Sequence, residues 1–587
     1  MRLSRRDDSK RGLHMKRTLF LLLFVFTVLT AYGFPPAANQ LPSNQPPATP
    51  PAIVTYQNGN SRLGQNLNET ILTTTSVNAT NFGKVFSYAT DGNIYAQPLY
   101  VPNVTINGSA HNVIYVVTEA DGIYAFDADS ATLNPAPLWY TSLVNGSTVI
   151  PVPCLDHHAA CTIYPNLGIT GTPAINLATN TMYFVARTKE VVNGNTTNPF
   201  YVERLHALDI TTGQEESYSP ATICSAIYVT SKMGCQFTSG LFNPLQDGQR
   251  PGILLEPTTG FSQGVLWIGF AGQGMMLAFD ASNLTQLADW TATPHPKNTT
   301  GGGGIWGSGG GVSGDANGNV FVSIGDGTFD VNVGGTNYGD SVVKLNVVSN
   351  GSGGYTIQVM DYFTPPDEAC RQTTDTDLGA GGPVLLPPQT GTVPNLIVIA
   401  GKGNVPACDT ANPIFLVNAD DMGGLGGGVQ SIASTAALGF WSSPAYFSTG
   451  IKFNIYMGGP VTVKTGDSLR QYQLTSGVLG TTSASKSIET YLSSPTPFIS
   501  ANGTKQGIVW TVQRPEVVDN EKGVNNAVLH AYTATNLHTE LYTSSTNATR
   551  DLAGPAVKFA VPTAVNGKVY VGTQTELDVY GLCPCPQ

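Results

Sequence analysis

The chain has few charged residues and no long amphipathic helical pattern. Only 11% of its 587 residues are Asp, Glu, Lys or Arg, and apolar residues do not recur at the spacing of three and four that marks an amphipathic helix. This argues against a helical bundle. Gly and Pro are abundant instead, with 65 and 39 copies, a composition typical of many short strands joined by tight turns.

Basic residues are scarce as well. The chain has 28 Lys and Arg against 39 Asp and Glu, which gives a formal net charge of −11. No concentration of Lys and Arg occurs outside the extreme N-terminus. Because phosphate binding needs concentrated positive charge, the sequence argues against a nucleic-acid partner.

Cysteine is limited to eight residues, and no two of them are adjacent. In an exported chain they suggest the disulfides Cys154–Cys161, Cys224–Cys235 and Cys370–Cys408. Cys583 and Cys585 stand in a C-terminal CPC sequence, where a mutual bridge would be strained. We expect them to stay free or to pair with another molecule.

The N-terminus predicts export. A basic flank precedes the apolar run 19–29, and small residues follow at 31–33, so that residues 1–33 resemble a signal peptide, with an uncleaved signal anchor as the alternative. Residues 34–52 are Pro- and Asn-rich and predict a flexible leader. We expect a periplasmic or extracellular protein that is folded from near Ile53. No membrane contact is expected, except through the N-terminus if the alternative of an uncleaved anchor holds.

One strand phrase recurs along the chain, most plainly as LHALDITTG at 205–213, LRQYQLTSG at 469–477 and LHAYTATNL at 529–537. Its eight copies are about 65 residues apart on average. Aligned on one position of the phrase, they are marked by Asp127, Asp209, Asp280, Asn346, Asn418, Gln473, Thr533 and Gly581. A long period of similar strands predicts an array of similar sheets.

Each repeat contains signals for four strands, which is the composition of a propeller blade. We therefore predict an all-β fold, an eight-bladed β-propeller with four antiparallel strands per blade. It would form a single domain over residues 53–582, with 583–587 as a tail. Since the last repeat lacks a fourth strand, the strand at 84–89 is expected to complete the last blade. Seven blades are the alternative, if the irregular unit near 237–290 merges with a neighbour.

Several motifs carry a resemblance to known proteins. Ala-Phe-Asp followed by Trp139, and again by Trp290, resembles the tryptophan-docking repeats of quinoprotein alcohol dehydrogenases, in which a Trp of one blade packs on the next. The segments GGGGIWGSGG, GNVFVSIGDGTFD, DYFTPPD, DTDLGAGGPVLL and VIAGKGN, all within 301–404, are similar in order and spacing to the cofactor-contacting stretches of that family. The whole chain also resembles exported bacterial PQQ-binding-like propellers, whose activity is undefined.

The resemblance implies two cofactors, PQQ and Ca²⁺, and a role for each matching residue. Trp306 corresponds to the floor under the quinone, and Asp326 to a Ca²⁺ ligand. Asp375, with Asp377 as the neighbouring candidate, corresponds to the carboxylate that takes the alcohol proton, and Asp375 also to a metal ligand. Lys402 corresponds to the basic residue beside the quinone oxygens. Each residue also has a structural interpretation. The Trp could fill an interface between blades, the Asp residues could bind backbone amides of turns, and the Lys could be a solvated residue in a turn.

Two features of the family are missing. The chain has no Cys-Cys pair for the vicinal disulfide, and the metal-binding Glu has no matching motif, so that Glu190, Glu203 and Glu256 are all candidates. Two functions remain open. One is a PQQ- and Ca²⁺-dependent dehydrogenase that oxidises an alcohol or sugar, and the other is a non-catalytic propeller that binds a partner or serves as an assembly scaffold.

Overall fold

The computed structural model describes residues 50–583 apart from 131, 133, 158–161, 228–233, 296–301, 308–309, 404–412, 435, 437, 463 and 516–524. The predicted export segment 1–33 and nearly all of the leader 34–52 lie outside this part, as do Cys161, Cys408 and Cys585. Among the described residues, no helix has the length and apolar character needed to cross a membrane.

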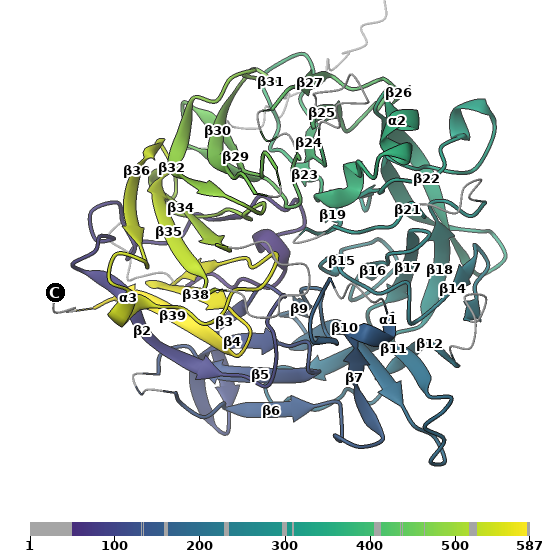
Figure 1. Cartoon of the computed structure of the whole chain (residues 1–587). Helices are drawn as coiled ribbons and strands as arrows, with labels where there is room; N and C mark the ends of the chain where they lie inside the picture. The colour runs from purple at the N-terminus through teal and green to yellow at the C-terminus, as the bar shows by residue number, and fades with distance from the viewer. Residues whose placement is uncertain are drawn as a thin grey trace, which may run out of the picture. The chain divides into compact units, whose positions relative to one another are not determined.

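Strands dominate this part of the chain, and they form eight sheets of four or more strands and one two-stranded sheet (Figure 1). The first large sheet contains β3 (Leu99–Ile106), β4 (Ser109–Val117), β5 (Gly122–Asp127) and β6 (Trp139–Ser142). The second contains β7 (Val149–Pro153), β8 (Asn166–Leu167), β9 (Ala174–Asn176), β10 (Thr181–Glu190), β11 (Phe200–Asp209) and β12 (Ala221–Ile227). The third contains β15 (Leu254–Glu256), β16 (Val265–Gly269), β17 (Met275–Asp280) and β18 (Gln286–Thr291). The two-stranded sheet pairs β13 (Cys235–Gln236) with β14 (Leu241–Phe242).

The next three sheets follow the same plan. The fourth contains β19 (Ser313–Gly314), β20 (Val320–Ser323), β21 (Val342–Ser349), β22 (Tyr355–Thr364) and β26 (Gly424–Leu425). The fifth contains β23 (Val384–Leu385), β24 (Leu396–Ala400), β25 (Ile414–Asn418) and β27 (Gln430–Ile432). The sixth contains β28 (Ala445–Ser448), β29 (Phe453–Met457), β30 (Asp467–Thr475), β31 (Val478–Leu479) and β32 (Ser485–Tyr491). Pairing is antiparallel except between β22 and β26 in these sheets.

The last two sheets combine strands from both ends of the chain. They contain β1 (Gln65–Asn66), β33 (Phe498–Asn502), β34 (Lys505–Gln513), β35 (Val528–Thr533) and β36 (Asn536–Thr543); and β2 (Phe82–Ala89), β37 (Thr563–Val565), β38 (Lys568–Gly572) and β39 (Glu576–Leu582). The helices are short: η1 (Tyr56–Asn58), α1 (Cys154–His157), η2 (Val331–Val333), α2 (Glu368–Thr373), η3 (Leu378–Ala380) and α3 (Ala548–Asp551). The chain is nearly all-β, with a sheet pattern consistent with a β-propeller.

The sequence repeat corresponds to one sheet per copy. The eight repeat positions lie in strands of eight different sheets, namely β5, β11, β17, β21, β25, β30, β35 and β39. In the irregular unit near 237–290, the strands β15–β18 make a sheet of their own.

The core lies between neighbouring sheets. Every residue of β16 and of β24 is buried, as expected for central strands that are covered on both faces. Tyr115 of β4 and Phe184 of β10 belong to one apolar cluster, and Val185 of β10 and Ile268 of β16 belong to the next. Each sheet therefore packs on the sheet that follows it in the chain.

The two tryptophans of the docking motif make contacts between sheets. The indole Nε1 of Trp139, in β6, donates to the carbonyl of Ile210 at 2.9 Å, just beyond β11 of the next sheet. Trp290, in β18, packs against Tyr338, with ring centroids 5.8 Å apart. These contacts agree with the packing that the resemblance implied.

The predicted strand at 84–89 lies in β2, which pairs antiparallel with β39 from Phe82↔Leu582 to Ala89↔Glu576. The sheet β37–β38–β39 thus takes its fourth strand from the N-terminal part of the chain. A strand edge that would otherwise expose unpaired backbone groups is covered in this way.

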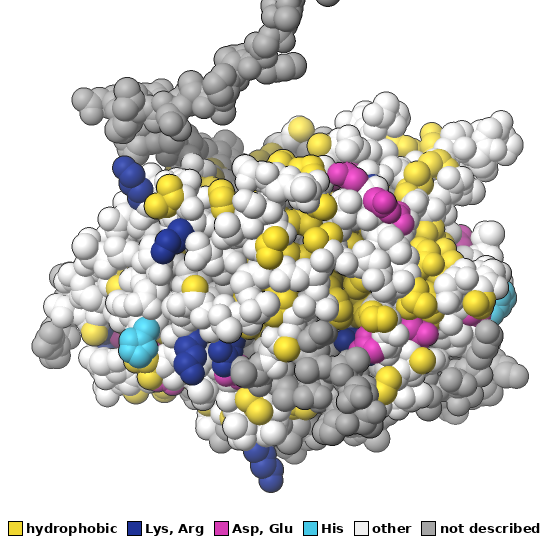
Figure 2. Space-filling view, turned by 90° about the horizontal axis from the view of Figure 1, so that it is seen from above, with side chains coloured by type: hydrophobic (Ala, Val, Ile, Leu, Met, Phe, Trp, Pro, Cys, Tyr) yellow, Lys and Arg dark blue, Asp and Glu magenta, His cyan; other side chains and the backbone are white. Residues whose placement is uncertain are grey.

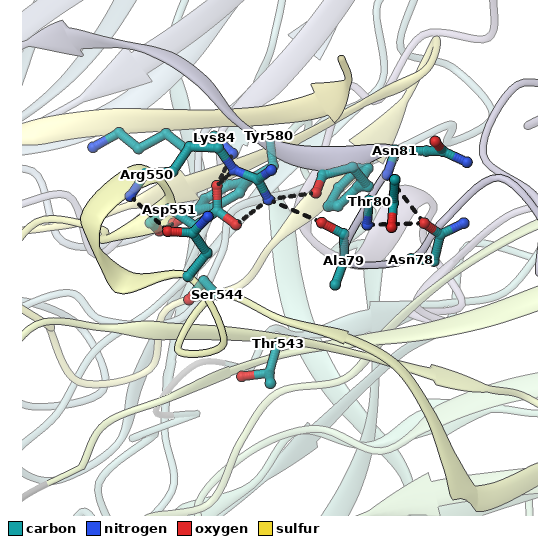
Figure 3. Close-up of polar contacts among 12 residues, drawn as sticks. Asn78, Ala79, Thr80, Asn81, Lys84, Thr543, Ser544, Arg550, Asp551 and Tyr580 are labelled. Atoms are coloured by element: carbon teal, nitrogen blue, oxygen red, sulfur yellow. Dashed lines mark hydrogen bonds and ion pairs between the residues drawn. The ribbon is translucent and has the colours of Figure 1, made fainter. Parts of the chain in front are cut away.

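A polar network next to β2 reinforces this pairing (Figure 3). The Arg550 guanidinium donates to the carbonyls of Ala79 at 3.3 Å and Phe82 at 3.1 Å. Asp551 accepts the backbone N–H of Lys84 at 3.0 Å and lies 2.6 Å from Arg550. The side chains of α3 therefore bind backbone that is more than 460 residues earlier in the sequence.

The segment 53–66 contacts one strand, or the residue just before one, in each of the eight sheets. Its partners are Tyr100 of β3, Ile175 of β9, Ile253 before β15, Gly314 of β19, Leu385 of β23, Tyr446 of β28, Ile499 of β33 and Ala564 of β37. Figure 1 shows the sheets following one another around this purple segment. The sequence analysis treated residue 53 only as the start of the fold and did not predict this central position.

Arg62 is the main polar contact of this segment, and it is fully buried. Its guanidinium donates to the carbonyls of Val312 at 2.8 Å, Tyr56 at 2.9 Å and Ile253 at 3.2 Å. Burial lowers the pKa of Arg62 to about 10, so that the group is still charged at neutral pH.

One predicted disulfide, Cys224–Cys235, is formed, and it joins β12 to β13. Cys154 and Cys370 are also disulfide-bonded, although their predicted partners lie outside the described residues. Cys583 is disulfide-bonded too, so that the first of the two expected outcomes, a free thiol, is wrong.

Charged side chains are sparse on the surface shown in Figure 2. The described Lys and Arg side chains on this face are scattered and form no continuous basic patch. This distribution agrees with the low charged fraction of the sequence, 11%.

Candidate functional site

All five predicted site residues line one cavity. It has a volume of about 430 Å³, and its walls are formed by His157, Thr162, Arg250, Trp306, Asp326, Asp375, Asp377, Ala380, Lys402, Trp441, Lys558 and Phe559. Residues from separate sequence motifs therefore meet at a single site. Their individual roles remain predictions.

The segments around Trp306 and Asp326 are hydrogen-bonded to each other. The N–H of Gly303 donates to the Asp326 carbonyl at 2.9 Å, and the N–H of Gly325 donates to the Gly304 carbonyl at 2.9 Å. A Cβ at Gly304 would lie 2.9 Å from the indole of Trp306, and one at Gly325 would lie 2.7 Å from it. Glycine is therefore required at both positions for the indole to lie where it does.

Asp377 is the buried centre of the polar groups. Its carboxylate accepts the backbone N–H of Asp326 at 2.8 Å, and its Oδ2 lies 2.5 Å from Nζ of Lys402. Asp377 is only 4% exposed. Lys402 follows β24, whereas Asp377 directly precedes η3, so that two segments are joined by this ion pair.

Asp375 occupies a different environment. Its side chain is 78% exposed, and its Oδ1 lies 2.7 Å from the same Lys402 ammonium. The backbone of Asp375 has a φ of 53°, a left-handed conformation that is uncommon outside glycine and is often found at functional sites. Asp375 is thus the carboxylate of the group with the freest access to solvent.

Mutual interactions shift the pKa values of all four groups. Burial, with Asp377 and Asp375 nearby, raises the pKa of Asp326 to about 8. Burial also raises the pKa of Asp375, against the effect of Lys402. For Asp377, burial is outweighed by the Lys402 charge and by hydrogen bonds, so that its pKa is lowered. Burial is likewise outweighed at Lys402, whose pKa is raised chiefly by Asp377.

The three aspartates are placed to hold a cation. Asp326, Asp375 and Asp377 each offer a carboxylate oxygen, and these oxygens lie within 4.8 Å of one another. Carboxylate oxygens are hard ligands of the kind that Ca²⁺ prefers. Lys402 now lies between two of them, so that a cation would compete with or displace its ammonium.

None of the three candidate glutamates lines the cavity. Glu203 pairs with Arg187 at 2.9 Å, Glu190 pairs with Arg204 at 2.5 Å, and Glu256 accepts from Asn60 at 2.8 Å. Their contacts are structural. Within the described residues, the cluster that could hold a metal therefore has three carboxylates and no glutamate.

Several cavity residues were not predicted from the sequence, above all Arg250 and Trp441. The Arg250 guanidinium lies over the Trp306 ring, with its Cζ 5.1 Å from the centroid. Neither residue belongs to the strand repeat or to a motif of the resemblance.

Sequence comparison gives no match, either to a protein family or to a curated protein. Structural comparison finds similar folds. A quinohemoprotein alcohol dehydrogenase from Comamonas testosteroni is 13% identical, with a TM-score of 0.54 over 92% of this chain and 82% of that one. One from Pseudomonas putida is 12% identical, with a TM-score of 0.52 over 91% and 81%. A europium-containing methanol dehydrogenase is 12% identical, with a TM-score of 0.50 over 90% and 98%.

These similarities show the fold alone. The chain shares the quinoprotein-like fold of these dehydrogenases over most of its length. At such low identity the comparison does not extend to substrate or cofactor.

Proposed function

We propose that the chain is an eight-bladed β-propeller of the quinoprotein kind, whose cavity binds PQQ and Ca²⁺ and supports the oxidation of an alcohol or sugar. The observation that carries this proposal is the convergence of Trp306, Asp326, Asp375, Asp377 and Lys402 on one cavity. The eight blades are supported by the eight sheets that contact the segment 53–66.

The residues present fit the cation well. Asp326 and Asp375 supply oxygen ligands, with Asp377 beside them. For the quinone, Trp306 offers a large flat surface. Arg250 covers part of it, so that a planar ring would stack on the other face or displace the guanidinium.

When bound, PQQ would supply the two-electron acceptor. Asp375, the most exposed carboxylate, would accept the hydroxyl proton of the substrate. Asp377 would hold Lys402 in place through their 2.5 Å contact. Lys402 would in turn keep a positive charge beside the ligand.

A spectroscopic titration tests the proposal on the purified chain. PQQ with Ca²⁺ is expected to give a saturable absorption change, and Trp306→Ala to abolish it. Trp290→Ala, at a half-buried tryptophan outside the cavity, is the control. Because one structural neighbour contains europium, Eu³⁺ luminescence can report the cation site, and Asp326→Asn should weaken it while Asp315→Asn does not.

A non-catalytic binding propeller is the second candidate. It is favoured by the absence of a glutamate among the described cavity residues and by the Lys402 ammonium between two aspartates. No absorption change at saturating PQQ would favour this candidate and exclude the dehydrogenase.

We also propose export to the periplasm or the cell exterior, with a small-molecule ligand and no nucleic-acid partner. The Cys224–Cys235 disulfide supports an oxidising compartment. Fractionation of cells that produce the full chain, followed by N-terminal sequencing of the mature protein, tests this. Recovery of the uncleaved chain in the cytosol would contradict it.

A further inference from the structure

A second set of polar groups lines the same cavity, apart from the aspartates. Thr162 connects two cations from separate loops: its Oγ1 accepts from Arg250 at 3.1 Å, and its carbonyl accepts from Nζ of Lys558 at 2.9 Å. All three residues line the cavity. One wall of the cavity therefore carries two positive charges held by a common residue.

The Arg250 guanidinium forms no ion pair among the described residues, and its hydrogen bond to Thr162 uses only part of its five N–H donors. The guanidinium also lies over the ring of Trp306, and the π face of an indole partly stabilises a cation. Donors of this planar group are thus available to a ligand in the cavity.

Within the described part of the chain, no carboxylate forms a direct ion pair with Arg250. Burial and the nearby charge of Arg187 lower the pKa of Arg250 to about 10, while Glu119 acts in the other direction. Arg187 already has its own partner, Glu203, at 2.9 Å. Glu119 accepts the backbone N–H of Gly168 at 2.7 Å. A cation that is half-buried and lacks an ion pair is stabilised by a bound anion.

We infer that Arg250 binds the carboxylate of the small molecule that the cavity takes as substrate, and that this substrate is a short hydroxycarboxylate. The fork of N–H donors of an arginine matches the two oxygens of a carboxylate. The substrate hydroxyl would then face the aspartates and Lys402. The cavity would thus bind the carboxylate at one end of the molecule and the hydroxyl at the other. The assignment of the hydroxyl as the reacting group rests on the proposed function.

Ligand binding to the cofactor-free full chain tests this inference. Glycolate and ethylene glycol differ only in the carboxylate, and their binding can be followed by tryptophan fluorescence, because Trp306 lies beside Arg250. Glycolate is expected to bind at least tenfold more tightly than ethylene glycol. Arg250→Gln should remove this preference, and Arg250→Lys should retain part of it. Arg470→Gln, at an arginine paired with Asp467 outside the cavity, should leave it unchanged.

Thr162→Ala provides a second variant in case Arg250→Gln does not fold. It keeps both charges but removes the acceptor that positions Arg250, and a severalfold weaker glycolate affinity is expected. Thermal unfolding of each variant shows whether the fold is retained. Equal binding of glycolate and ethylene glycol by the unmodified chain would overturn the inference, as would unchanged glycolate binding by Arg250→Gln and Thr162→Ala.

A parallel PQQ titration separates this inference from the proposed function. If the chain binds no PQQ but binds glycolate through Arg250, the dehydrogenase is excluded and the carboxylate site stands. If Arg250→Gln loses PQQ affinity while glycolate never binds, the cation serves the quinone and the inference is wrong.

Discussion

Lys402 and Asp377 contact each other at two points. The Lys402 ammonium lies 2.5 Å from Asp377 Oδ2, and the Lys402 backbone N–H donates to the Asp377 carbonyl at 2.9 Å. The backbone contact fixes the two segments, and the side-chain contact neutralises a carboxylate that is only 4% exposed. The ion pair is therefore part of the wall of the cavity.

Replacement of Lys402 by Gln should destabilise the protein by about 3 to 5 kcal/mol, because it leaves the buried Asp377 carboxylate without its cation. Urea unfolding measures the change. If the aspartates bind Ca²⁺, millimolar Ca²⁺ should restore part of the loss. Lys452→Gln, at an exposed lysine, is the control, and an equal loss in both variants would contradict the prediction.

Arg62→Leu should lower the free energy of unfolding by about 3 kcal/mol or more, because the carbonyls of Val312 and Ile253 lose a donor in a buried environment. Arg204→Leu removes a half-buried arginine that is paired with Glu190. This substitution should lower the free energy of unfolding by about 1 kcal/mol or less. Calorimetry of the two variants makes the comparison. Similar melting temperatures for Arg62→Leu and Arg204→Leu would show that the hydrogen bonds of Arg62 contribute little to stability.

Asp551→Asn should weaken the junction between α3 and β2. The substitution removes a charge that bonds to Arg550 and to the Lys84 N–H, and hydrogen bonds to charged groups contribute about 1.5 to 3 kcal/mol each. The rate of backbone amide hydrogen exchange should increase more in β2 than in β16. Asp129→Asn, in an exposed pair with Lys568, should have little effect on either strand.

Stability should fall as pH rises toward neutrality, in part because of Glu119. Burial, only partly opposed by the Gly168 N–H, raises the pKa of this group from 4.5 to about 7 in the folded chain. The folded state therefore binds a proton that the unfolded state has released, so that the stabilisation is complete below pH 4.5 and is lost as pH rises through 7.

Between pH 4.5 and 8, the free energy of unfolding should fall by about 3 kcal/mol less in Glu119→Gln than in the unmodified chain. Denaturant unfolding at several pH values measures it. The exposed Asp421→Asn serves as the comparison, and the prediction fails if both variants keep the slope of the unmodified chain.

The repeat was sufficient to predict the strands because each copy of the phrase corresponds to a strand in its own sheet, from β5 to β39. The pairing of β2 with β39 followed from a missing strand in the last repeat. The resemblance to quinoprotein alcohol dehydrogenases, in the order and spacing of the segments within 301–404, indicated the site residues that meet in the cavity. Local patterns were informative here because they recur, or because they match the order of segments in a family.

The rest depends on contacts that no local pattern records. Residues 53–66 have neither strand alternation nor repeat, yet they bind all eight sheets. Arg250 lies about 55 residues before Trp306 in the sequence, and only the packing of successive sheets brings its guanidinium over the indole. Thr162 and Lys558 are almost 400 residues apart, so that their hydrogen bond could not be foreseen.

The position of residues 53–66 also constrains how the chain can fold during synthesis. These residues emerge from the ribosome early, but their last partner, Ala564, is made some 500 residues later. Contacts at such separations form slowly, and a partly made chain has only a fraction of them. Until Val312 has been made, the arginine of this segment lacks one of its acceptors and must remain hydrated. The segment can form its full set of contacts only after Ala564 has been added.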